Sequence, residues 1–337
     1  MTTEILDRFV LDFPAKRLWE SVHDCLERDV SVSLLIVVES DGSAPGRAGF
    51  KMAVTAEGKL VGTIGGGIVE QELLGKAREQ WKEDEPRYLL ERRHYDGAME
   101  DDSVCGGRQT IALYPCRKTD SIVVERLMGL FENREKGILR LSPSGISLVP
   151  GGHSPEHCRF EPASEDEWVY EENIGFVDTV YIIGGGHVGV ALSRVLAMLD
   201  FYVVILDERS DIPISGDWAH GRIVVSYDEI GGHIPDGNGN YAVIMTTNHR
   251  ADRLVLEQLL NKKLSYLGMM GSRRKIDEVF RELRNQGVPQ MILQGIHAPI
   301  GVPIKSHTPA EIAISIAAEI VGSKNGWRNG FSEGDRG

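Results

Sequence analysis

The sequence predicts an α/β protein, with a C-terminal Rossmann-like doubly wound parallel sheet and an N-terminal α+β domain. The first observation is an apolar run from Val180 to Ile183 that leads into a glycine turn, a helical pattern and a second apolar run over 201–207. The second is the alternation of strand and helix patterns over 176–326, which is typical of a mostly parallel sheet. The third is length, since 337 residues exceed one typical hydrophobic core.

We place the domain boundaries where the composition changes. The N-terminal domain is expected over 1–170, and its last part, near 151–170, is a polar linker with several glycines and prolines. The Rossmann-like domain is expected over 176–326, followed by a polar tail over 327–337. Polar, glycine-bearing stretches are typical of connections between separately packed domains.

Composition and charge exclude several classes of protein. The chain is 42% hydrophobic and 26% charged, as expected for a soluble globular protein, and its net charge of -13 disfavours nucleic acid and anionic membranes as partners. It has no apolar run near the roughly 18 residues of a membrane helix, and its first residues do not resemble a signal peptide. Four scattered cysteines without a C-x-x-C pair favour reduced thiols, so we expect a cytoplasmic protein.

The N-terminal domain shows the patterns of a mixed α and β structure. Apolar spacing predicts helices over 15–28, 68–81 and 121–133. Apolar and β-branched runs predict strands over 30–38, 51–55, 59–64, 88–95 and 109–115, and a hairpin over 137–149. We interpret 151–167 as a polar loop. It contains His153, His157 and Cys158, but no further ligand nearby completes a tetrahedral zinc site.

A run of three glycines is the first candidate ligand site. Gly65, Gly66 and Gly67 stand between a predicted strand and a predicted helix. Free N–H groups and the helix dipole favour an anion at such a point. The alternative is a tight strand-to-helix turn that binds no ligand.

A cysteine with two glycines after it is the second candidate. Cys105 is followed by Gly106 and Gly107, so the backbone is open on one side of the thiol. Such a sulfur is able to face a ligand. The alternative is a buried structural thiol, which is the commoner fate of a single cysteine.

The glycine turn of the C-terminal domain has the G-x-G-x-x-G spacing of a dinucleotide site. Gly184, Gly186 and Gly189 allow a tight turn, the approach of a pyrophosphate and close packing of the helix on the strand. Asp207, at the end of the next strand, falls where a carboxylate accepts hydrogen bonds from ribose hydroxyls. Arg209 is placed to meet a phosphate or to pair with neighbouring acids.

Later elements of this domain follow the same alternation. Strands are predicted over 222–226, 241–246 and 264–269, and helices over 251–260, 272–284 and from Thr308, where Pro309 and Glu311 complete a capping box. Ser272 is the predicted N-cap of a helix that begins with Arg273, Arg274 and Lys275. Cations are unfavourable there unless an anion is near, so this is a candidate phosphate site, and a solvated basic turn is the alternative.

Two histidines of this domain have open roles. His187 lies inside the glycine turn, where its ring contacts a ligand or packs locally. His297 stands beside Pro299 in an apolar loop and is either a structural loop residue or a ligand contact.

Taken together, these motifs resemble the XdhC/CoxI family, the accessory proteins of xanthine dehydrogenase and related molybdenum hydroxylases. In the N-terminal half the resemblance rests on Gly42 to Arg47, Gly62 to Gly67 with Glu70, and Cys105 to Gly107. In the C-terminal half it rests on Gly184 to Gly189, Asp207 to Arg209, Leu267 to Lys275, and His297 to Gly301 with Thr308 to Ser315. Many relatives have a cysteine where this chain has Ile68, which excludes a thiol role at that position.

The resemblance implies a cytoplasmic chaperone, without turnover of its own, that holds the molybdenum cofactor (molybdopterin), protects it during sulfuration and inserts it into an apo hydroxylase such as xanthine dehydrogenase. It also implies a cysteine desulfurase as partner, and a homodimer. The cofactor-binding residues expected on this basis are Arg47, Gly65, Gly66, Gly67, Glu70, Cys105, Gly106, Gly107, Gly184, Gly186, His187, Gly189, Asp207, Arg209, Ser272, Arg273, Arg274 and His297. Cys105 is also a candidate molybdenum contact, because a thiolate suits a soft metal centre.

The alternative function is an NAD(P)-dependent oxidoreductase, with His187 or His297 as acid and base. Against it, the N-terminal domain shows no paired histidine and carboxylate at an informative spacing. A weaker alternative is a nucleotide-sensing regulatory protein without chemistry. The Rossmann domain is expected to hold the pterin phosphate or a separate nucleotide such as NAD(P).

Overall fold

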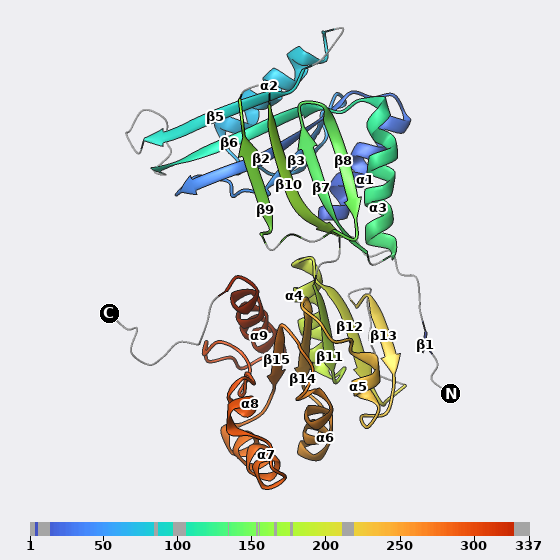
Figure 1. The fold of residues 1–337 in the computed structure, drawn as a ribbon, viewed down its shortest axis with the longest axis vertical. Coiled ribbons are helices and arrows are strands. Elements are labelled where there is room, and N and C mark those ends of the chain that lie inside the picture. The colour runs from blue at the N-terminus through green and yellow to red at the C-terminus, as the bar shows by residue number, and fades with distance from the viewer. Residues whose placement is uncertain are drawn as a thin grey trace. The chain divides into compact units, whose positions relative to one another are not determined.

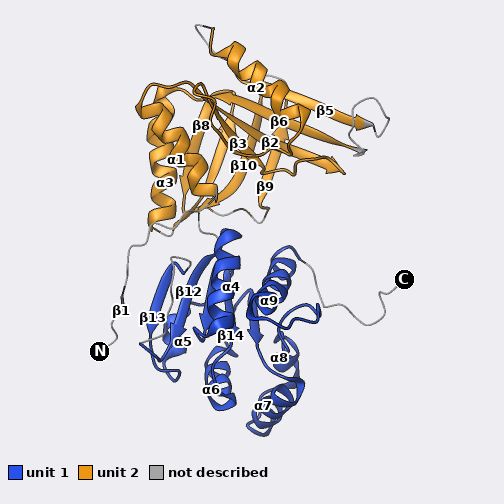
Figure 2. Cartoon of the chain, turned by 180° about the vertical axis from the view of Figure 1, so that it is seen from behind, with its two compact units in different colours: residues 1–11, 178–337 blue, residues 12–177 orange. Residues whose placement is uncertain are grey.

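The chain forms two compact units, the N-terminal unit of residues 12–177 and the C-terminal unit of residues 1–11 with 178–337 (Figure 2). The computed structural model describes residues 4–5, 14–83, 87–96, 106–133, 135–152, 154, 156–164, 167–175, 178–210 and 219–326. Each unit has its own sheets, and each is described by itself below. The predicted α/β class, with a Rossmann domain at the C-terminal end, is confirmed.

The C-terminal unit is built on a six-stranded sheet with the order β1-β13-β12-β11-β14-β15 (Figure 1). The strands are β1 (Glu4–Ile5), β11 (Thr179–Ile183), β12 (Tyr202–Asp207), β13 (Gly221–Val224), β14 (Asn240–Ile244) and β15 (Tyr266–Met269). The strands β11 to β15 are parallel, and only β1 is antiparallel to its neighbour β13. Counted along the chain, the parallel strands have the order 3-2-1-4-5, which is the Rossmann order with its switch point between β11 and β14.

Helices cover this sheet and supply much of its core. They are α4 (His187–Met198), α5 (Ile230–His233), α6 (His249–Leu259), α7 (Arg273–Asn285), α8 (Gln290–Gln294) and α9 (Pro309–Lys324). Helices α4 and α9 lie side by side (Figure 1). Their side chains Leu192, Leu196, Ile316 and Ile320 pack into one buried cluster with the strands. The predicted capping box of α9 is present, since the Thr308 hydroxyl and the N3 carboxylate each accept a backbone N–H of the other residue.

The N-terminal unit contains two antiparallel sheets, ordered β4-β3-β2-β6-β5 and β8-β7-β10-β9. The strands are β2 (Val32–Gly42), β3 (Lys51–Thr55), β4 (Leu60–Gly62), β5 (Leu89–Asp96), β6 (Gly106–Pro115), β7 (Lys136–Ser142), β8 (Gly145–Pro150), β9 (Cys158–Pro162) and β10 (Trp168–Gly175). The helices are α1 (Pro14–Glu27), α2 (Ile68–Gln80) and α3 (Ser121–Asn133), the last preceded by the short 3-10 helix η1 (Lys118–Asp120). Helix α2 buries Leu73 and Ala77 against inward side chains of β2, β3 and β6, whereas α1 contacts β2 to β4 and α3 contacts β7, β8 and β10.

An ion pair between a partly buried lysine and a buried glutamate joins the two sheets of this unit. Lys51 on β3 places its Nζ 2.7 Å from both carboxylate oxygens of Glu172 on β10. Glu172 is only 2% exposed, and the buried Tyr170 hydroxyl donates a further hydrogen bond to it. The same Lys51 ammonium donates to the Gly49 carbonyl, which fixes the end of the loop before β3.

One prediction about this unit was wrong. The stretch 151–167, interpreted as a loop, contains the strand β9, which pairs antiparallel with the unpredicted strand β10. The sequence of β9, Cys-Arg-Phe-Glu-Pro, lacks apolar alternation because it is an edge strand with mostly uncovered side chains. The short elements β1, α5 and α8 were also not predicted, since two to five residues carry too little periodicity.

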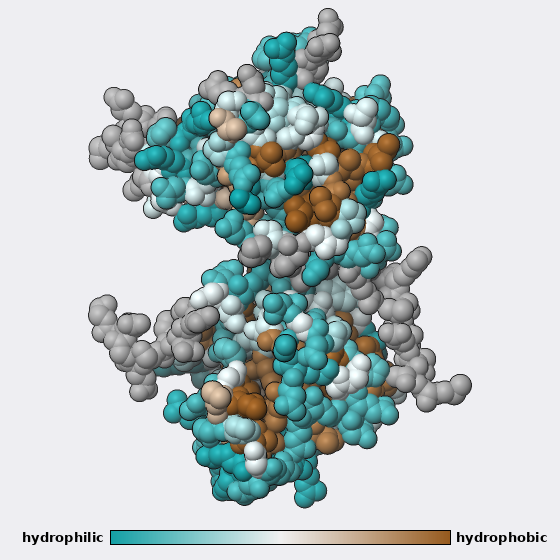
Figure 3. Space-filling model, in the orientation of Figure 1, coloured by the Kyte–Doolittle hydropathy of each residue, from teal (hydrophilic) through white to brown (hydrophobic). Residues whose placement is uncertain are grey.

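On the face drawn in Figure 3, the described surface of each unit is mainly polar. Figure 3 shows teal side chains over most of this face, with smaller brown groups on both units. The most exposed large apolar side chains, Met291, Met198, Ile122 and Ile68, lie on four different helices. Among the described helices, none combines the length and apolar character needed to cross a bilayer.

Candidate functional site

The three sequence motifs of the N-terminal unit meet at one place. A Cβ added at Gly46 would lie 2.1 Å from the Ile64 carbonyl oxygen, and one at Gly65 would lie 2.7 Å from the Gly46 nitrogen. A Cβ at Gly107 would lie 2.7 Å from the Ala44 nitrogen. The loop after β2 therefore contacts both the glycine run before α2 and the start of β6, and these glycines are needed for that contact.

Gln109 holds this arrangement together, although it was not among the predicted site residues. Its side chain is 2% exposed, donates to the Ile64 carbonyl at 3.0 Å and accepts from the Tyr95 hydroxyl at 2.8 Å. It shares the inward face of β6 with Ile111 and Leu113. A glutamine at the core-facing position of an alternating strand was the available signal, because a buried amide needs polar partners.

The Glu70 side chain accepts hydrogen bonds at the glycine run and from the two residues before it. Its Oε1 accepts hydrogen bonds from the Thr63 hydroxyl at 2.7 Å, the Ile64 N–H at 3.0 Å and the Gly66 N–H at 2.9 Å. Burial alone raises the pKa of this carboxyl, but the three donors outweigh burial and lower it. Part of the predicted anion cradle is therefore occupied by the protein's own carboxylate.

Beside Glu70, the start of α2 is open. Gly66 and Gly67 have φ of 82° and 73°, and a Cβ at either would meet nothing within 4 Å. Gly67 is the N-cap and provides no side-chain hydrogen bond to the helix. The Gly66 N–H already donates to Glu70, and an N–H group at a helix start suits an anion where the protein supplies no acceptor. Arg47 is exposed and donates to the Gly42 carbonyl at 2.8 Å in the adjoining loop, and Cys105, one residue before β6, lies outside the described residues.

In the glycine turn of the C-terminal unit, two glycines are required by internal packing and one is not. Gly184 has φ of 114°, and a Cβ there would lie 2.3 Å from the Met245 carbonyl oxygen. A Cβ at Gly189 would lie 2.2 Å from the Gly184 carbonyl oxygen. Gly186, in contrast, has an ordinary φ of -73° and nothing within 4 Å of its Cβ position. Internal packing thus explains the first and third glycines, and it leaves the middle one free for a ligand.

Asp207, expected to accept from a ribose, binds the protein's own donors. Its carboxylate is 1% exposed and accepts from the Gly185 N–H at 2.7 Å and from the Arg209 N–H at 3.0 Å. The Arg209 side chain adds two more bonds, from Nε at 3.0 Å and Nη2 at 2.9 Å. Burial raises the pKa of Asp207, but these hydrogen bonds prevail and lower it. A ribose hydroxyl therefore meets a carboxylate that already has partners.

The basic start of α7 is only partly explained by the protein itself. Ser272 is the N-cap, as predicted, and its hydroxyl accepts from the Lys275 N–H at 3.3 Å. Lys275 forms an ion pair with the fully buried Asp252, so one of the three cations has an internal role. Arg273 and Arg274 are exposed. Their role at a phosphate site stays a prediction.

The two histidines differ in their surroundings. His187 is exposed at the first position of α4. The backbone of His297 extends the parallel sheet as a single bridge to Gly268, and its ring stacks on Tyr266 with centroids 4.3 Å apart. Its Nδ1 is 3.3 Å from a carboxylate oxygen of Glu319. These contacts favour the structural alternative for His297.

The hydrogen bonds that Glu319 makes with its neighbours predict how the stability of the protein depends on pH. Burial raises its pKa, but hydrogen bonds with His297, the Tyr266 hydroxyl and the Gly301 N–H lower it overall. A lowered folded-state pKa means that its contribution to stability is present above the unfolded-state value of about 4.3 and is lost as the pH falls through the lower folded-state value.

Glu319→Gln is therefore expected to lower stability at pH 7 and to flatten the loss of stability below about pH 5. Urea unfolding curves measured from pH 7 to about pH 3 check this. The matched control is Glu278→Gln on α7, where the side chain is exposed. Parallel stability-versus-pH curves for wild type and Glu319→Gln contradict the assignment.

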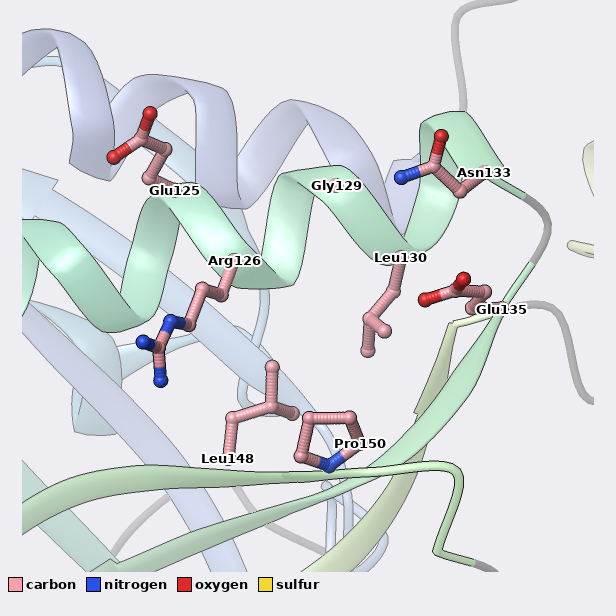
Figure 4. Close-up of a pocket in the computed structure, with 8 residues that line it drawn as sticks. All are labelled: Glu125, Arg126, Gly129, Leu130, Asn133, Glu135, Leu148 and Pro150. Carbon is pink, nitrogen blue, oxygen red and sulfur yellow. The ribbon is translucent and has the colours of Figure 1, made fainter.

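Two other features lie apart from these motifs. A pocket of about 540 Å³ on the N-terminal unit contains none of the predicted site residues. Figure 4 shows its lining, which consists of Glu125, Arg126, Gly129, Leu130, Asn133, Glu135, Leu148 and Pro150. Among the described residues, no three His, Cys, Asp or Glu side chains gather as metal ligands, and His153 lies outside them.

The strand order and the glycine turn identify the C-terminal unit as a Rossmann domain. Comparison with known protein families gives the same assignment for this unit. Residues 180–320 match the XdhC Rossmann domain, and residues 25–96 match the XdhC and CoxI family. The chain belongs to the XdhC and CoxI family.

Relatives from two bacteria match most of the chain. Uncharacterized protein YqeB of Escherichia coli (strain K12) is 28% identical over 311 residues, which is 90% of this chain and 46% of that protein. The chain thus spans less than half of that relative. A probable xanthine dehydrogenase subunit of Bacillus subtilis (strain 168) is 21% identical, covering 88% of this chain and 94% of that one. Molybdenum cofactor insertion chaperone PaoD of Escherichia coli (strain K12) is 23% identical, covering 85% and 81%.

A solved structure has the same fold. A crystal structure described as a xanthine dehydrogenase from Bacillus halodurans superposes with a TM-score of 0.71 at 20% identity. The match covers 92% of this chain and 97% of that chain.

Proposed function

We propose that this protein is an accessory chaperone of molybdenum hydroxylases that binds the molybdenum cofactor, protects it during sulfuration and inserts it into an apo-enzyme of the xanthine dehydrogenase type. Membership of the XdhC and CoxI family and the similarity to the insertion chaperone PaoD support this function. The proposal includes a cysteine desulfurase as second partner, a homodimer and a cytoplasmic location.

The observation that carries the proposal is the meeting of three motif loops in the N-terminal unit. Gly46, Gly65 and Gly107 come from segments far apart in the sequence, yet each needs to be glycine because another loop touches it. A purely structural turn before α2 requires only the glycine run itself. Packing the loop after β2 against both the glycine run before α2 and the start of β6 instead builds a small surface of backbone donors and short side chains.

The chemistry of the cargo matches this surface. Molybdopterin combines a phosphate, a flat polar pterin and a soft metal-dithiolene. The open start of α2 at Gly67 suits the phosphate, with the exposed Arg47 in the adjoining loop as a further cation. Cys105 is the thiol nearest in sequence to this place, and a thiolate suits the metal.

A nicotinamide-dependent oxidoreductase is the competing function, and the Rossmann strand order is the observation that favours it. Two measurements separate the functions. Purified protein is incubated with molybdopterin or with NAD(P)H, and binding is measured together with transfer of the cofactor to apo-hydroxylase. Nicotinamide oxidation without pterin binding would overturn the chaperone proposal.

Cys105→Ser tests the thiol within this proposal. We expect the variant to fold normally but to retain molybdopterin at least about tenfold less well, because serine removes a soft ligand. The control is Cys158→Ser on β9, a half-buried thiol of the same unit outside the three loops. Cofactor retention is measured after gel filtration. Equal retention by both variants and the wild type would remove Cys105 from the site.

A further inference from the structure

The end of β12 carries an arrangement that the chaperone function does not use. In Rossmann domains, an acid at this position accepts from the ribose 2′-hydroxyl of NAD, whereas a nearby arginine accommodates the 2′-phosphate of NADP. Here Asp207 is 1% exposed and Arg209 covers it with two side-chain hydrogen bonds. The Arg209 side chain itself is 42% exposed. A ligand that reaches the end of β12 therefore meets a guanidinium first.

A buried hydroxyl lies at the same point. Tyr227 follows β13 and is 4% exposed, and burial together with the Asp207 carboxylate raises its pKa. This hydroxyl lies near enough to the Asp207 carboxylate to affect its own pKa, but by distance and angle it makes no full hydrogen bond with any described residue. A buried donor without a partner costs free energy, and a ligand atom at this point would satisfy it.

Further charge around Arg209 favours an anion. Arg222 on β13 donates from Nη2 to the Arg209 carbonyl at 3.2 Å and to the Ser210 carbonyl at 2.8 Å, so a second guanidinium supports the turn. Among the described residues of this turn, the opposing charges are the Asp207 carboxylate, which is already paired, and the exposed Glu208.

We propose that the C-terminal unit binds a dinucleotide whose adenosine ribose carries a 2′-phosphate, with the pyrophosphate at Gly186 and the 2′-phosphate at Arg209. The Gly185 N–H bonds to Asp207, so the glycine turn and the end of β12 adjoin each other as one dinucleotide requires. This site belongs to the C-terminal unit alone and goes beyond the proposed chaperone function, because it requires no molybdopterin and no turnover.

Equilibrium binding of NADPH and NADH to the full chain tests the proposal. Arginine bonds to phosphate are among the strong charge-assisted kind, so we expect NADPH to bind at least about tenfold more tightly than NADH. Adenosine 2′,5′-bisphosphate is expected to compete with NADPH better than adenosine 5′-monophosphate does. Arg209→Gln is expected to weaken NADPH binding and so to remove this preference, since glutamine cannot supply the charge.

Two control variants distinguish the loss of the phosphate contact at Arg209 from a general loss of folded structure. Arg281→Gln, an exposed position on α7, is expected to keep the preference for NADPH. Arg209→Lys retains the charge and is expected to restore part of the preference, which a purely structural role of Arg209 would not give. Failure of both dinucleotides to bind, or equal affinity of the wild type for both, overturns the proposal. Molybdopterin binding is measured separately, so this outcome leaves the chaperone proposal standing.

Discussion

Gly184→Ala is expected to destabilise the C-terminal unit by about 3 kcal/mol. Two penalties add at this position. The residue has φ of 114°, a region that alanine rarely adopts, and the new Cβ would lie 2.3 Å from the Met245 carbonyl oxygen. That carbonyl follows β14 and cannot move without disturbing the parallel pairing of β11 with β14. Hydrogen exchange of the β11 and β12 amides measures the loss.

Gly186→Ala is the matched variant two residues later. Its Cβ would meet nothing within 4 Å and its φ suits alanine, so we expect a change in stability of about 0.5 kcal/mol or less. Loss of dinucleotide binding with unchanged stability is the expected result, because the methyl group blocks the approach of a pyrophosphate. Equal destabilisation by the two substitutions would contradict this division of roles.

Lys51→Met is expected to destabilise the N-terminal unit by about 3 kcal/mol at neutral pH. The substitution keeps the length of the side chain but leaves the Glu172 carboxylate, which is 2% exposed, without its cation. It also removes the bond that the ammonium donates to the Gly49 carbonyl. Urea unfolding of the variant, followed by circular dichroism, measures the effect.

A second substitution distinguishes an unpaired charge from lost packing. In Lys51→Met with Glu172→Leu, both charges are replaced by apolar groups, and we expect most of the lost stability to return. The Tyr170 hydroxyl then loses its acceptor, which limits the recovery. A double variant as unstable as the sum of the single variants would show that the pair has no coupling.

The regular elements of the C-terminal unit were predictable because their signals are local. Apolar runs and helical spacing mark β11, α4 and β12, and the glycine spacing requires a tight turn between the first two. The capping box at Thr308 was readable for the same reason, since N-cap and N3 residues are three positions apart.

The partners of the site residues were not predictable from local patterns. The sequence left open whether Arg209 meets a phosphate or pairs with a nearby acid, and no spacing rule chooses between these alternatives. The structure shows the pairing, with Asp207 as the acid. The meeting of Gly46, Gly65 and Gly107 depends on sheet register across distant segments. The edge strand β9 has no core-facing alternation to detect. Cys105 lies outside the described residues, so its role stays a prediction.

The bonds that Glu70 makes have a consequence for the thermodynamics of recognition. Because Oε1 already fixes Thr63, Ile64 and Gly66, the loop keeps its shape before any guest arrives. A ligand that binds at the start of α2 therefore does not have to order this part of the backbone, so the conformational entropy lost on binding is small. We therefore expect a ligand to bind this preorganised loop without a conformational change, at an association rate set by diffusional encounter and orientation.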